Sequence, residues 1–353
     1  MPALIPHSRP TISESDLQAV AEVIRSGRLA QGQRVQEFEE QMATFLGRKG
    51  AVATSSGTAA LHLALLAMGI GAGDAVICPS YVCIAVLQAI RYVGAAPVLV
   101  DIDPATFNLC PRAVRAALTP KTKAIVVPHL FGLPADLDEL AACGLPLLED
   151  CAQTFGGQYR QRKVGSVGTV AIFSFFATKL LCTGEGGMVV ADAPEILERL
   201  RDLRDYDERL DDRLRFNYKL TDMQAALGLS QLARLPAFVQ RRRDIAARYR
   251  LAFSGLPVQL PHTPEDREHQ YYRFVITVAP HCDSLQEFTS RQEISCRRPI
   301  FRPLHYYLNH QGFPATEAAW SQALSIPVYP SLTDEEVERI ISCLHQWTAQ
   351  CRT

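Results

Sequence analysis

The chain has 353 residues, of which 48% are hydrophobic and 21% are charged, and its formal net charge at pH 7 is -1. This balance excludes a general electrostatic attraction to nucleic acid or to acidic membranes, so we expect partners of neither kind. The length allows a large core domain and a smaller second domain, and no apolar run approaches the roughly 20 residues of a membrane-spanning helix.

Cysteine usage bears on the compartment and on metal binding. The ten cysteines show no Cys-x-x-Cys pair and no paired Cys/His spacing, so we expect no metal site. Several of them lie in apolar runs, where cysteine behaves as a small hydrophobic residue. The first ten residues also lack the long apolar core of a signal peptide. We therefore expect a protein of the reducing cytoplasm.

Helical periodicity predicts two helices at the start of the chain. Ser13 and Asp16 have the spacing of a capping box before the first helix, which ends at Gly27, and a second helix ends at Gly47. From residue 50, short apolar strands alternate with helices, which indicates a mostly parallel sheet covered on both faces. The predicted strands are 51–53, 75–78, 97–100, 123–127, 146–148, 169–175 and 189–190, and the helices between them are 58–68, 82–92, 111–118 and 135–143.

The composition changes near residue 256, where Pro257, Pro261 and Pro264 indicate a linker. We therefore expect an N-terminal arm and a large domain over residues 1–255, and a small domain over residues 256–353. The remaining predicted elements are helices at 195–205, 223–232, 237–253 and 333–347, a strand at 271–278 and a solvated charged loop at 206–215.

Polar residues stand at the ends of three predicted strands. Ser56 precedes a helix, Asp150 ends a strand, and Lys179 follows a strand inside an uncharged stretch that finishes in a Gly-rich turn. Ligands of such sheets bind beyond the carboxyl ends of the strands, so these residues are expected on a common rim. Desolvation favours the neutral amine of a lysine, which suits a nucleophile. The alternative is a lysine whose stem packs on the core while its head reaches water.

Four motifs carry a resemblance to a known family. The segments Ser-Gly-Thr-Ala-Ala-Leu (56–61), Glu-Asp-Cys-Ala-Gln (149–153), Phe-Ser-Phe-x-x-Thr-Lys (173–179) and Thr-Gly-Glu-Gly-Gly (183–187) resemble the DegT/DnrJ/StrS family of pyridoxal-phosphate (PLP) sugar aminotransferases. The resemblance spans nearly the whole chain. It implies the α/β fold of type I PLP aminotransferases, with a mostly parallel seven-stranded sheet flanked by helices and a smaller α+β C-terminal domain. It also implies a homodimer with shared active sites.

The resemblance assigns two catalytic residues. Lys179 would bind the cofactor aldehyde covalently and then move the substrate proton, and its presence favours transamination because relatives without this lysine carry out dehydration. Asp150 would keep the pyridine nitrogen protonated; the alternative is an aspartate that caps the next helix. By the same resemblance, Gln153 would contact the phenolic oxygen, and the phosphate would bind Gly57, Thr58, Ser174 and, from the neighbouring subunit, Asn217.

Two positions depart from the family pattern. The cofactor ring is usually backed by an aromatic side chain at the position of Cys83. Either the Cys83 sulfur packs on the ring or Tyr81 swings across it, and the register favours Cys83. Lys219 stands where many members have Arg. The planar guanidinium group, which can form two parallel hydrogen bonds, is therefore replaced by a compact ammonium group.

Substrate contacts are expected at Gln31, Glu185, Arg298, Arg302 and His305 by the same resemblance. The arginines suit a diphosphate, because guanidinium groups bind such anions with paired hydrogen bonds. The alternative is that they bridge surface carboxylates. For the loop at Gln31, the alternative is a plain connecting turn.

The sequence thus predicts a PLP-dependent aminotransferase that moves an amino group from glutamate or glutamine to a nucleotide-linked 3-keto or 4-keto deoxysugar. One alternative keeps the chemistry and changes the acceptor to a cyclitol ketone such as scyllo-inosose, as in aminoglycoside biosynthesis. Another is a PLP-binding regulator without catalysis. An amino donor would bleach the absorption band of the lysine-bound cofactor in an enzyme and leave it unchanged in a regulator.

Overall fold

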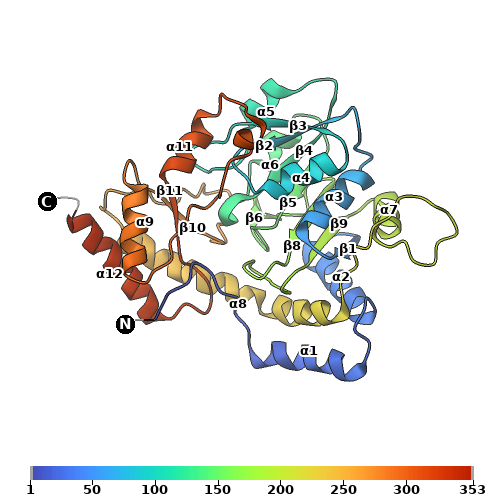
Figure 1. The fold of residues 1–353 in the computed structure, drawn as a ribbon, viewed down its shortest axis with the longest axis horizontal. Coiled ribbons are helices and arrows are strands. Elements are labelled where there is room, and N and C mark those ends of the chain that lie inside the picture. The colour runs from blue at the N-terminus through green and yellow to red at the C-terminus, as the bar shows by residue number, and fades with distance from the viewer. Residues whose placement is uncertain (1–2, 351–353) are drawn as a thin grey trace.

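A seven-stranded sheet forms the centre of the computed structural model, which describes residues 3–350 (Figure 1). In spatial order its strands are β1 (Gly50–Thr54), β9 (Gly187–Ala191), β8 (Val170–Ser174), β5 (Leu147–Asp150), β4 (Thr122–Pro128), β2 (Ala75–Pro79) and β3 (Ala96–Val100). β2 pairs in parallel with β3 and β4, β4 with β5, and β5 with β8, while β9 is antiparallel to both of its neighbours. The predicted mostly parallel seven-stranded sheet is therefore confirmed.

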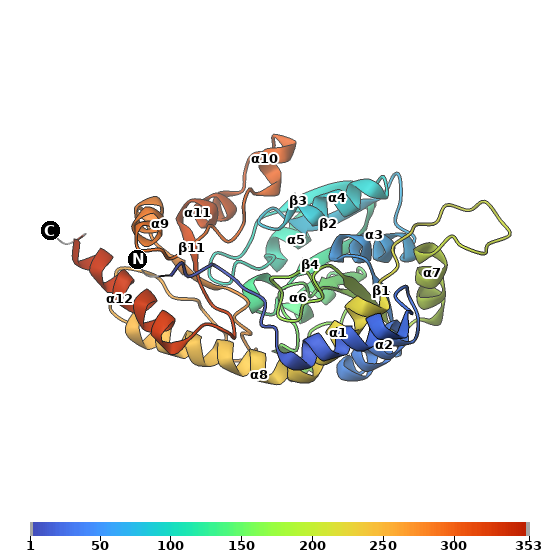
Figure 2. The same cartoon turned by 60° about the horizontal axis from the view of Figure 1, so that its bottom comes forward.

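Helices cover both faces of this sheet (Figures 1 and 2). One layer consists of α3 (Gly57–Ala67), α4 (Ile84–Tyr92) and α7 (Pro194–Arg204), and the other of α2 (Gln33–Leu46), α5 (Pro111–Ala117), α6 (Leu137–Ala141) and α8 (Asp222–Ala252). Successive strand residues face opposite layers. In β8, Ile172 packs in the core of the first layer and Phe173 in the core of the second. This double burial explains why the strands read as continuous apolar runs.

The first helix, α1 (Glu14–Ser26), packs along α8 in both views (Figures 1 and 2). The capping box predicted at its start is present, because the Ser13 backbone amide donates a hydrogen bond to the Asp16 carboxylate at 2.9 Å. The buried Asp16 carboxylate also accepts hydrogen bonds from Gln231 and Arg234 of α8, at 2.9 and 2.8 Å. These bonds fix the N-terminal arm on the long helix.

The long helix α8 corrects one prediction. We expected two helices separated near residue 236, but the structure has one helix of 31 residues with Pro236 inside it. A proline removes a helical hydrogen bond and normally kinks or ends a helix. Leu235 and Phe238, on either side of this proline, are buried, so packing holds both halves in one helix. Neither α8 nor any other helix of residues 3–350 is long and apolar enough to cross a membrane.

The C-terminal residues build a second hydrophobic core. It combines β10 (Phe274–Thr277) and β11 (Ala323–Ile326) with α9 (Cys282–Arg291) and α12 (Asp334–Gln350). Ile5 and the last turns of α8 pack in the same core. Residues 256–353 remain our proposed small domain, and its core thus takes in residues from the first part of the chain. The shorter elements are η1 (Leu130–Gly132), β6 (Gln158–Tyr159), β7 (Arg162–Lys163), α10 (Leu304–Leu308) and α11 (Pro314–Gln322).

The segment between α7 and α8 leaves the body of the molecule as a long loop, at the right of Figures 1 and 2. Its charged residues pair with one another, since Arg215 lies 2.7 Å from Asp211. Leu210 and Leu214 are exposed on it. The predicted solvated loop is therefore confirmed over residues 206–214, whereas Arg215 is buried.

Candidate active site

The start of α3 lies against the end of β8. Ser56 caps the helix by accepting a hydrogen bond from the Ala59 amide at 3.1 Å. The amides of Gly57 and Thr58 have no partner inside the helix, because the first amides of a helix lack a preceding turn. A Cβ on Gly57 would lie 2.7 Å from the Ser174 Cβ and 3.0 Å from its Oγ. Two amides and a hydroxyl therefore converge at a helix N-terminus, an arrangement that suits a phosphate.

Asp150 is the last residue of β5 and only 8% of its surface is exposed. Its Oδ1 accepts a hydrogen bond from the Ala152 amide at 3.0 Å. Burial raises the pKa of the carboxyl, and the Ala152 amide and the Lys179 charge oppose that rise. The residues that follow form turns and no helix, so Asp150 is not a helix cap. A buried carboxylate of this kind gains from a cationic partner.

A buried network surrounds the residue before Asp150. Glu149 accepts a hydrogen bond from His129 at 3.1 Å and further bonds from the Gly165 and Gly168 amides at 2.8 and 2.5 Å. Burial alone would raise the pKa of Glu149, but His129 and these amides lower it below its ordinary value. These hydrogen bonds thus stabilise the buried negative charge of Glu149.

His129, Glu149 and Cys151 place ligand-type atoms within 4.8 Å of one another. The His129 Nδ1 accepts a hydrogen bond from the Ala135 amide at 3.0 Å, and its other nitrogen faces Glu149. Both ring nitrogens of His129 are thus hydrogen-bonded, and the Glu149 oxygens accept hydrogen bonds from the Gly165 and Gly168 amides, so the protein itself satisfies these two side chains. We therefore interpret the cluster as support for the sheet rather than as a metal centre.

Gln153 is oriented by the backbone beside it. Its Oε1 accepts a hydrogen bond from the Phe131 amide at 2.9 Å. The amide nitrogen is therefore the end of the side chain that remains for a ligand, and it can only donate. Such a donor suits an anionic oxygen.

Lys179 lies in the turn that follows β8. Its Nζ is 5.0 Å from the centre of the Tyr272 ring. Within residues 3–350 no carboxylate lies within ion-pair distance of this amine, yet its charge lowers the pKa of Asp150. The two predicted catalytic residues thus lie close enough to interact electrostatically.

Tyr272 is a neighbour of Lys179 that no motif in the sequence indicates. Its hydroxyl lies 3.3 Å from the Thr178 Oγ1, and its ring centre lies 5.0 Å from the Lys179 Nζ and 5.1 Å from the Arg273 guanidinium. The alternation of residues 271–278 predicts a strand there. The observed strand β10 begins at Phe274, two residues after Tyr272, and the alternation carries no information about the distant Lys179.

The two candidates for backing the cofactor ring differ in exposure. Tyr81 is fully buried and its ring packs 6.1 Å from those of Phe107 and Phe131. Cys83 is exposed at the N-terminal end of α4. Tyr81 would have to leave the core to reach a ligand, so the geometry favours Cys83.

Asn217 is exposed at the end of the projecting loop. The next residue, Tyr218, accepts a hydrogen bond through its carbonyl from the Ser55 amide at 2.8 Å. The loop therefore returns to the body beside the start of α3. Lys219 forms an ion pair with Asp205 at 2.7 Å, so a carboxylate of this loop balances its charge.

His305 is buried, with 1% of its surface exposed. The Ser80 Oγ accepts a hydrogen bond from the His305 amide at 3.2 Å and lies 2.7 Å from the His305 Nδ1, with which it shares a hydrogen bond. Burial lowers the pKa of His305. Ser80 follows β2, and the pair ties the predicted substrate segment to that strand. The other ring nitrogen, Nε2, is buried without a hydrogen-bond partner among the described residues and lies 3.7 Å from the Glu317 carboxylate.

The two predicted arginines differ in their partners. Arg298 lies 2.6 Å from Asp283 and packs over the Trp320 ring, which fits the alternative of a bridging arginine. Arg302 is exposed, lies 5.3 Å from the centre of the Tyr306 ring, and has no carboxylate partner among the residues described. Of the two, Arg302 is the one available to an anion.

Gln31 lines a cleft of about 940 Å³ between α1 and α2, and its Oε1 is buried without a hydrogen-bond partner among the described residues. Asp222 shapes this loop by accepting a hydrogen bond from the Gly32 amide at 2.8 Å. The Glu185 carbonyl accepts a hydrogen bond from Gln224 at 2.8 Å, while its side chain is exposed. In the part of the chain described, no hydrogen bond or ion pair joins Gln31 or Glu185 to Lys179.

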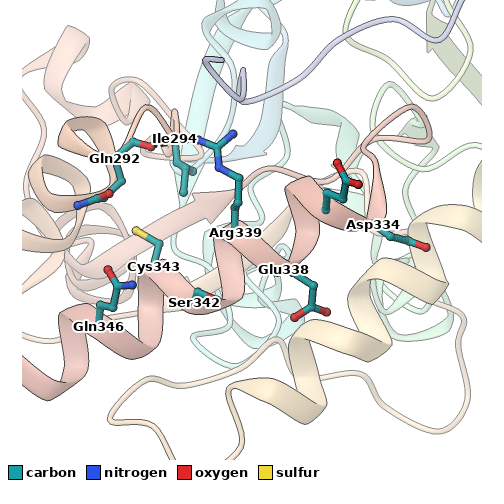
Figure 3. Close-up of a pocket in the computed structure, with 9 residues that line it drawn as sticks. Gln292, Ile294, Asp334, Glu338, Arg339, Ser342, Cys343 and Gln346 are labelled. Carbon is teal, nitrogen blue, oxygen red and sulfur yellow. Dashed lines mark hydrogen bonds between the residues drawn. The ribbon is translucent and has the colours of Figure 1, made fainter. Parts of the chain in front are cut away.

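A separate surface groove of about 560 Å³ lies along α12, beside residues 292–294 (Figure 3). Asp334 and Glu338 on its rim are each 2.6 Å from Arg248 of α8. The groove contains none of the residues predicted to hold cofactor or substrate, and we assign it no function.

The sequence and the fold are similar to those of known aminotransferases. The model of the DegT/DnrJ/EryC1/StrS aminotransferase family matches residues 10–345. The chain is 38% identical to the spore coat polysaccharide biosynthesis protein SpsC of Bacillus subtilis (strain 168), over 96% of each chain. DesV of S. venezuelae shares 36% identity over 94% of both chains, with a TM-score of 0.90.

The PLP-form of the putative sugar aminotransferase Spr1654 of Streptococcus pneumoniae shares 27% identity over 99% of this chain and 100% of its own, with a TM-score of 0.93. The family match and these structures together identify both the class of enzyme and its cofactor. The chain belongs to the DegT/DnrJ/EryC1/StrS aminotransferase family and is a PLP-dependent aminotransferase.

Proposed function

We propose that this aminotransferase moves an amino group from glutamate or glutamine to the carbonyl carbon of a nucleotide-linked 3-keto or 4-keto deoxysugar. One observation carries the proposal: the ends of β1, β5 and β8 present an anion cradle, a buried carboxylate and a lysine without a carboxylate partner in residues 3–350. The names of two relatives support a sugar acceptor, because SpsC is named for polysaccharide biosynthesis and Spr1654 as a putative sugar aminotransferase.

The residues at this edge of the sheet fit PLP. A Cβ on Gly57 would fill the cradle, so we assign the phosphate to the Gly57 and Thr58 amides and the Ser174 hydroxyl. Asp150 would pair with the ring nitrogen, and Gln153 would donate to the phenolic oxygen. When bound, PLP supplies an aldehyde and an electron-withdrawing ring.

We assign the proton transfers to Lys179. Its Nζ would accept the proton released from the amino-bearing carbon of the donor and return one to the carbonyl carbon of the acceptor. Its position 5.0 Å from the Tyr272 ring, without a carboxylate partner in the residues described, leaves the amine available for this work.

We assign the substrate diphosphate to Arg302, because this exposed arginine has no carboxylate partner among residues 3–350. Arg302→Gln is expected to raise the KM for the nucleotide sugar about 10-fold to 100-fold, the usual effect of losing charged hydrogen bonds. Arg298→Gln is the matched control, because Arg298 is paired with Asp283. Equal effects of the two substitutions would contradict the assignment to Arg302.

We also propose a homodimer with shared active sites, working in the cytoplasm. Asn217 is exposed on a loop that projects from the body (Figures 1 and 2), which suits a residue that reaches the phosphate site of a neighbouring chain. The nine cysteines within residues 3–350 are free thiols, as a reducing compartment would keep them.

A substrate panel tests the acceptor class. With glutamate or glutamine as donor, the reconstituted enzyme should aminate keto-deoxysugar nucleotides and leave the free cyclitol ketone scyllo-inosose unreacted. Product formation is measured by mass spectrometry. A preference for the free cyclitol would overturn the proposed acceptor.

A further inference from the structure

We propose that Tyr272 is a positioning residue for Lys179, which orients the amine with its ring and fixes the turn that carries it with its hydroxyl. The inference rests on the proposed role of Lys179. It concerns a residue outside the motifs that identify the family, and it links the cofactor lysine to the second hydrophobic core.

Tyr272 contacts two consecutive residues of one turn. The Lys179 Nζ lies 5.0 Å from the centre of its ring, and the Thr178 Oγ1 lies 3.3 Å from its hydroxyl oxygen. A cation at this distance from an aromatic ring is attracted by the ring electrons. The ring therefore restrains the amine, while the hydroxyl restrains the neighbouring Thr178 side chain of the same turn.

The tyrosine itself is held rigidly. It is 7% exposed, and the buried Arg242 of α8 donates hydrogen bonds to its carbonyl at 3.4 Å and to the Val328 carbonyl at 2.6 Å. A Cβ on Gly132 would lie only 2.7 Å from its backbone nitrogen. Since β10 begins two residues later, at Phe274, these contacts connect the Lys179 turn to the second core.

Three cations lie close to Tyr272. The Lys179 Nζ and the Arg273 guanidinium lie 5.0 and 5.1 Å from its ring centre, and Arg242 of α8 donates a hydrogen bond to its backbone carbonyl. From the N-terminal arm, His7 lies 3.0 Å from the Arg273 guanidinium and is itself neutral, since burial lowers its pKa to about 3. Burial alone would raise the pKa of Tyr272, but Lys179 and Arg273 lower it to about 8.

A titration of the cofactor-free protein tests the contact. Phenolate absorbance is followed with pH, and the difference between the wild type and Tyr272→Phe isolates this residue among the 11 tyrosines. We expect Tyr272 to titrate with a pKa of about 8. Lys179→Gln should move that pKa toward the ordinary value of about 10, because a facing cation is lost.

Lys163→Gln is the matched control. Lys163 lies 4.4 Å from the centre of the Phe45 ring, so this change also removes a lysine from an aromatic contact but leaves Tyr272 untouched. An unchanged Tyr272 titration in Lys179→Gln would overturn the proposal. So would a difference spectrum with no tyrosine titrating below the ordinary range.

Covalent capture of PLP tests positioning. The half-saturating PLP concentration for borohydride labelling of Lys179 is measured by peptide mass spectrometry. Tyr272→Leu should raise it about tenfold, whereas Tyr272→Phe, which keeps the ring, should raise it less than about threefold. Unfolding curves confirm that both variants fold. Equal labelling of Tyr272→Leu and the wild type would overturn the positioning role. If borohydride labels another lysine in the wild type, that result contradicts the proposed function instead. The pH titration of Tyr272 would still test its contact with Lys179.

Discussion

Asp150 combines burial with one backbone hydrogen bond, so its carboxylate gains strongly from a protonated ring nitrogen. Asp150→Asn is expected to lower kcat/KM about 100-fold or more, comparable to removing one preorganised electrostatic partner. Asp150→Glu keeps the charge and should retain more activity. PLP content is measured alongside, and an Asn variant with full PLP content and an unchanged rate would contradict the assignment.

Cys83 is exposed at the position where the family resemblance predicts a side chain that backs the cofactor ring. If its sulfur backs the cofactor ring, PLP should protect it from alkylation. Cys83→Phe should tighten PLP binding about threefold to tenfold through aromatic stacking. Cys110, which is partly exposed outside the proposed site, is the control thiol and should be alkylated equally with and without PLP.

The measurement is peptide mass spectrometry after brief alkylation. Equal labelling of Cys83 in both states would remove it from the cofactor site.

At the scale of single residues, the sequence predicts the site residues that lie close together in one motif. Lys179 and Ser174 share one motif, and Asp150 and Gln153 another. Tyr272 could not be found in this way, because its contact with Lys179 depends on how two distant segments pack. The same reason applies to the burial of His305, which depends on its contacts with Ser80 and with the Phe313 ring.

The long helix α8 makes Pro236 testable at the scale of an element. An interior proline costs about 3 kcal/mol of helix stability, and its replacement returns roughly 0.4–1 kcal/mol of entropy to the unfolded chain. Pro236→Ala is therefore expected to raise the free energy of unfolding by about 2 kcal/mol, measured in urea. Pro257→Ala, at an exposed position outside any helix, should give no gain. A Pro236→Ala variant with a lower free energy of unfolding than the wild type would contradict this prediction and show that the proline stabilises the helix.

Most strands of the sheet are predictable because each is a short apolar run that is buried on both faces and alternates with helices. The break expected in α8 is wrong because a local rule about proline yields to packing on both sides of Pro236. The two-residue strands β6 and β7 leave no periodic signal, since period-two alternation needs more residues to be visible.

The whole molecule is tested by mixing inactive subunits. Lys179→Gln and Asn217→Ala chains are each purified, mixed in equal amounts and allowed to exchange. In a dimer with shared sites, hybrid molecules contain one intact site, so activity should rise to about a quarter of the wild-type value. Light scattering verifies the dimer. Activity that stays at the level of the separate variants would place Asn217 in its own subunit's site.

The central claim is that Lys179 is the residue to which PLP binds covalently. Wild-type protein is reconstituted with PLP, reduced with borohydride and digested, and each peptide that contains one of its lysines is weighed by mass spectrometry. We predict that the reduced cofactor is found on the Lys179 peptide and that Lys179→Gln retains none. A label on Lys49, Lys121, Lys123, Lys163 or Lys219, or no label on the wild type, would contradict this account.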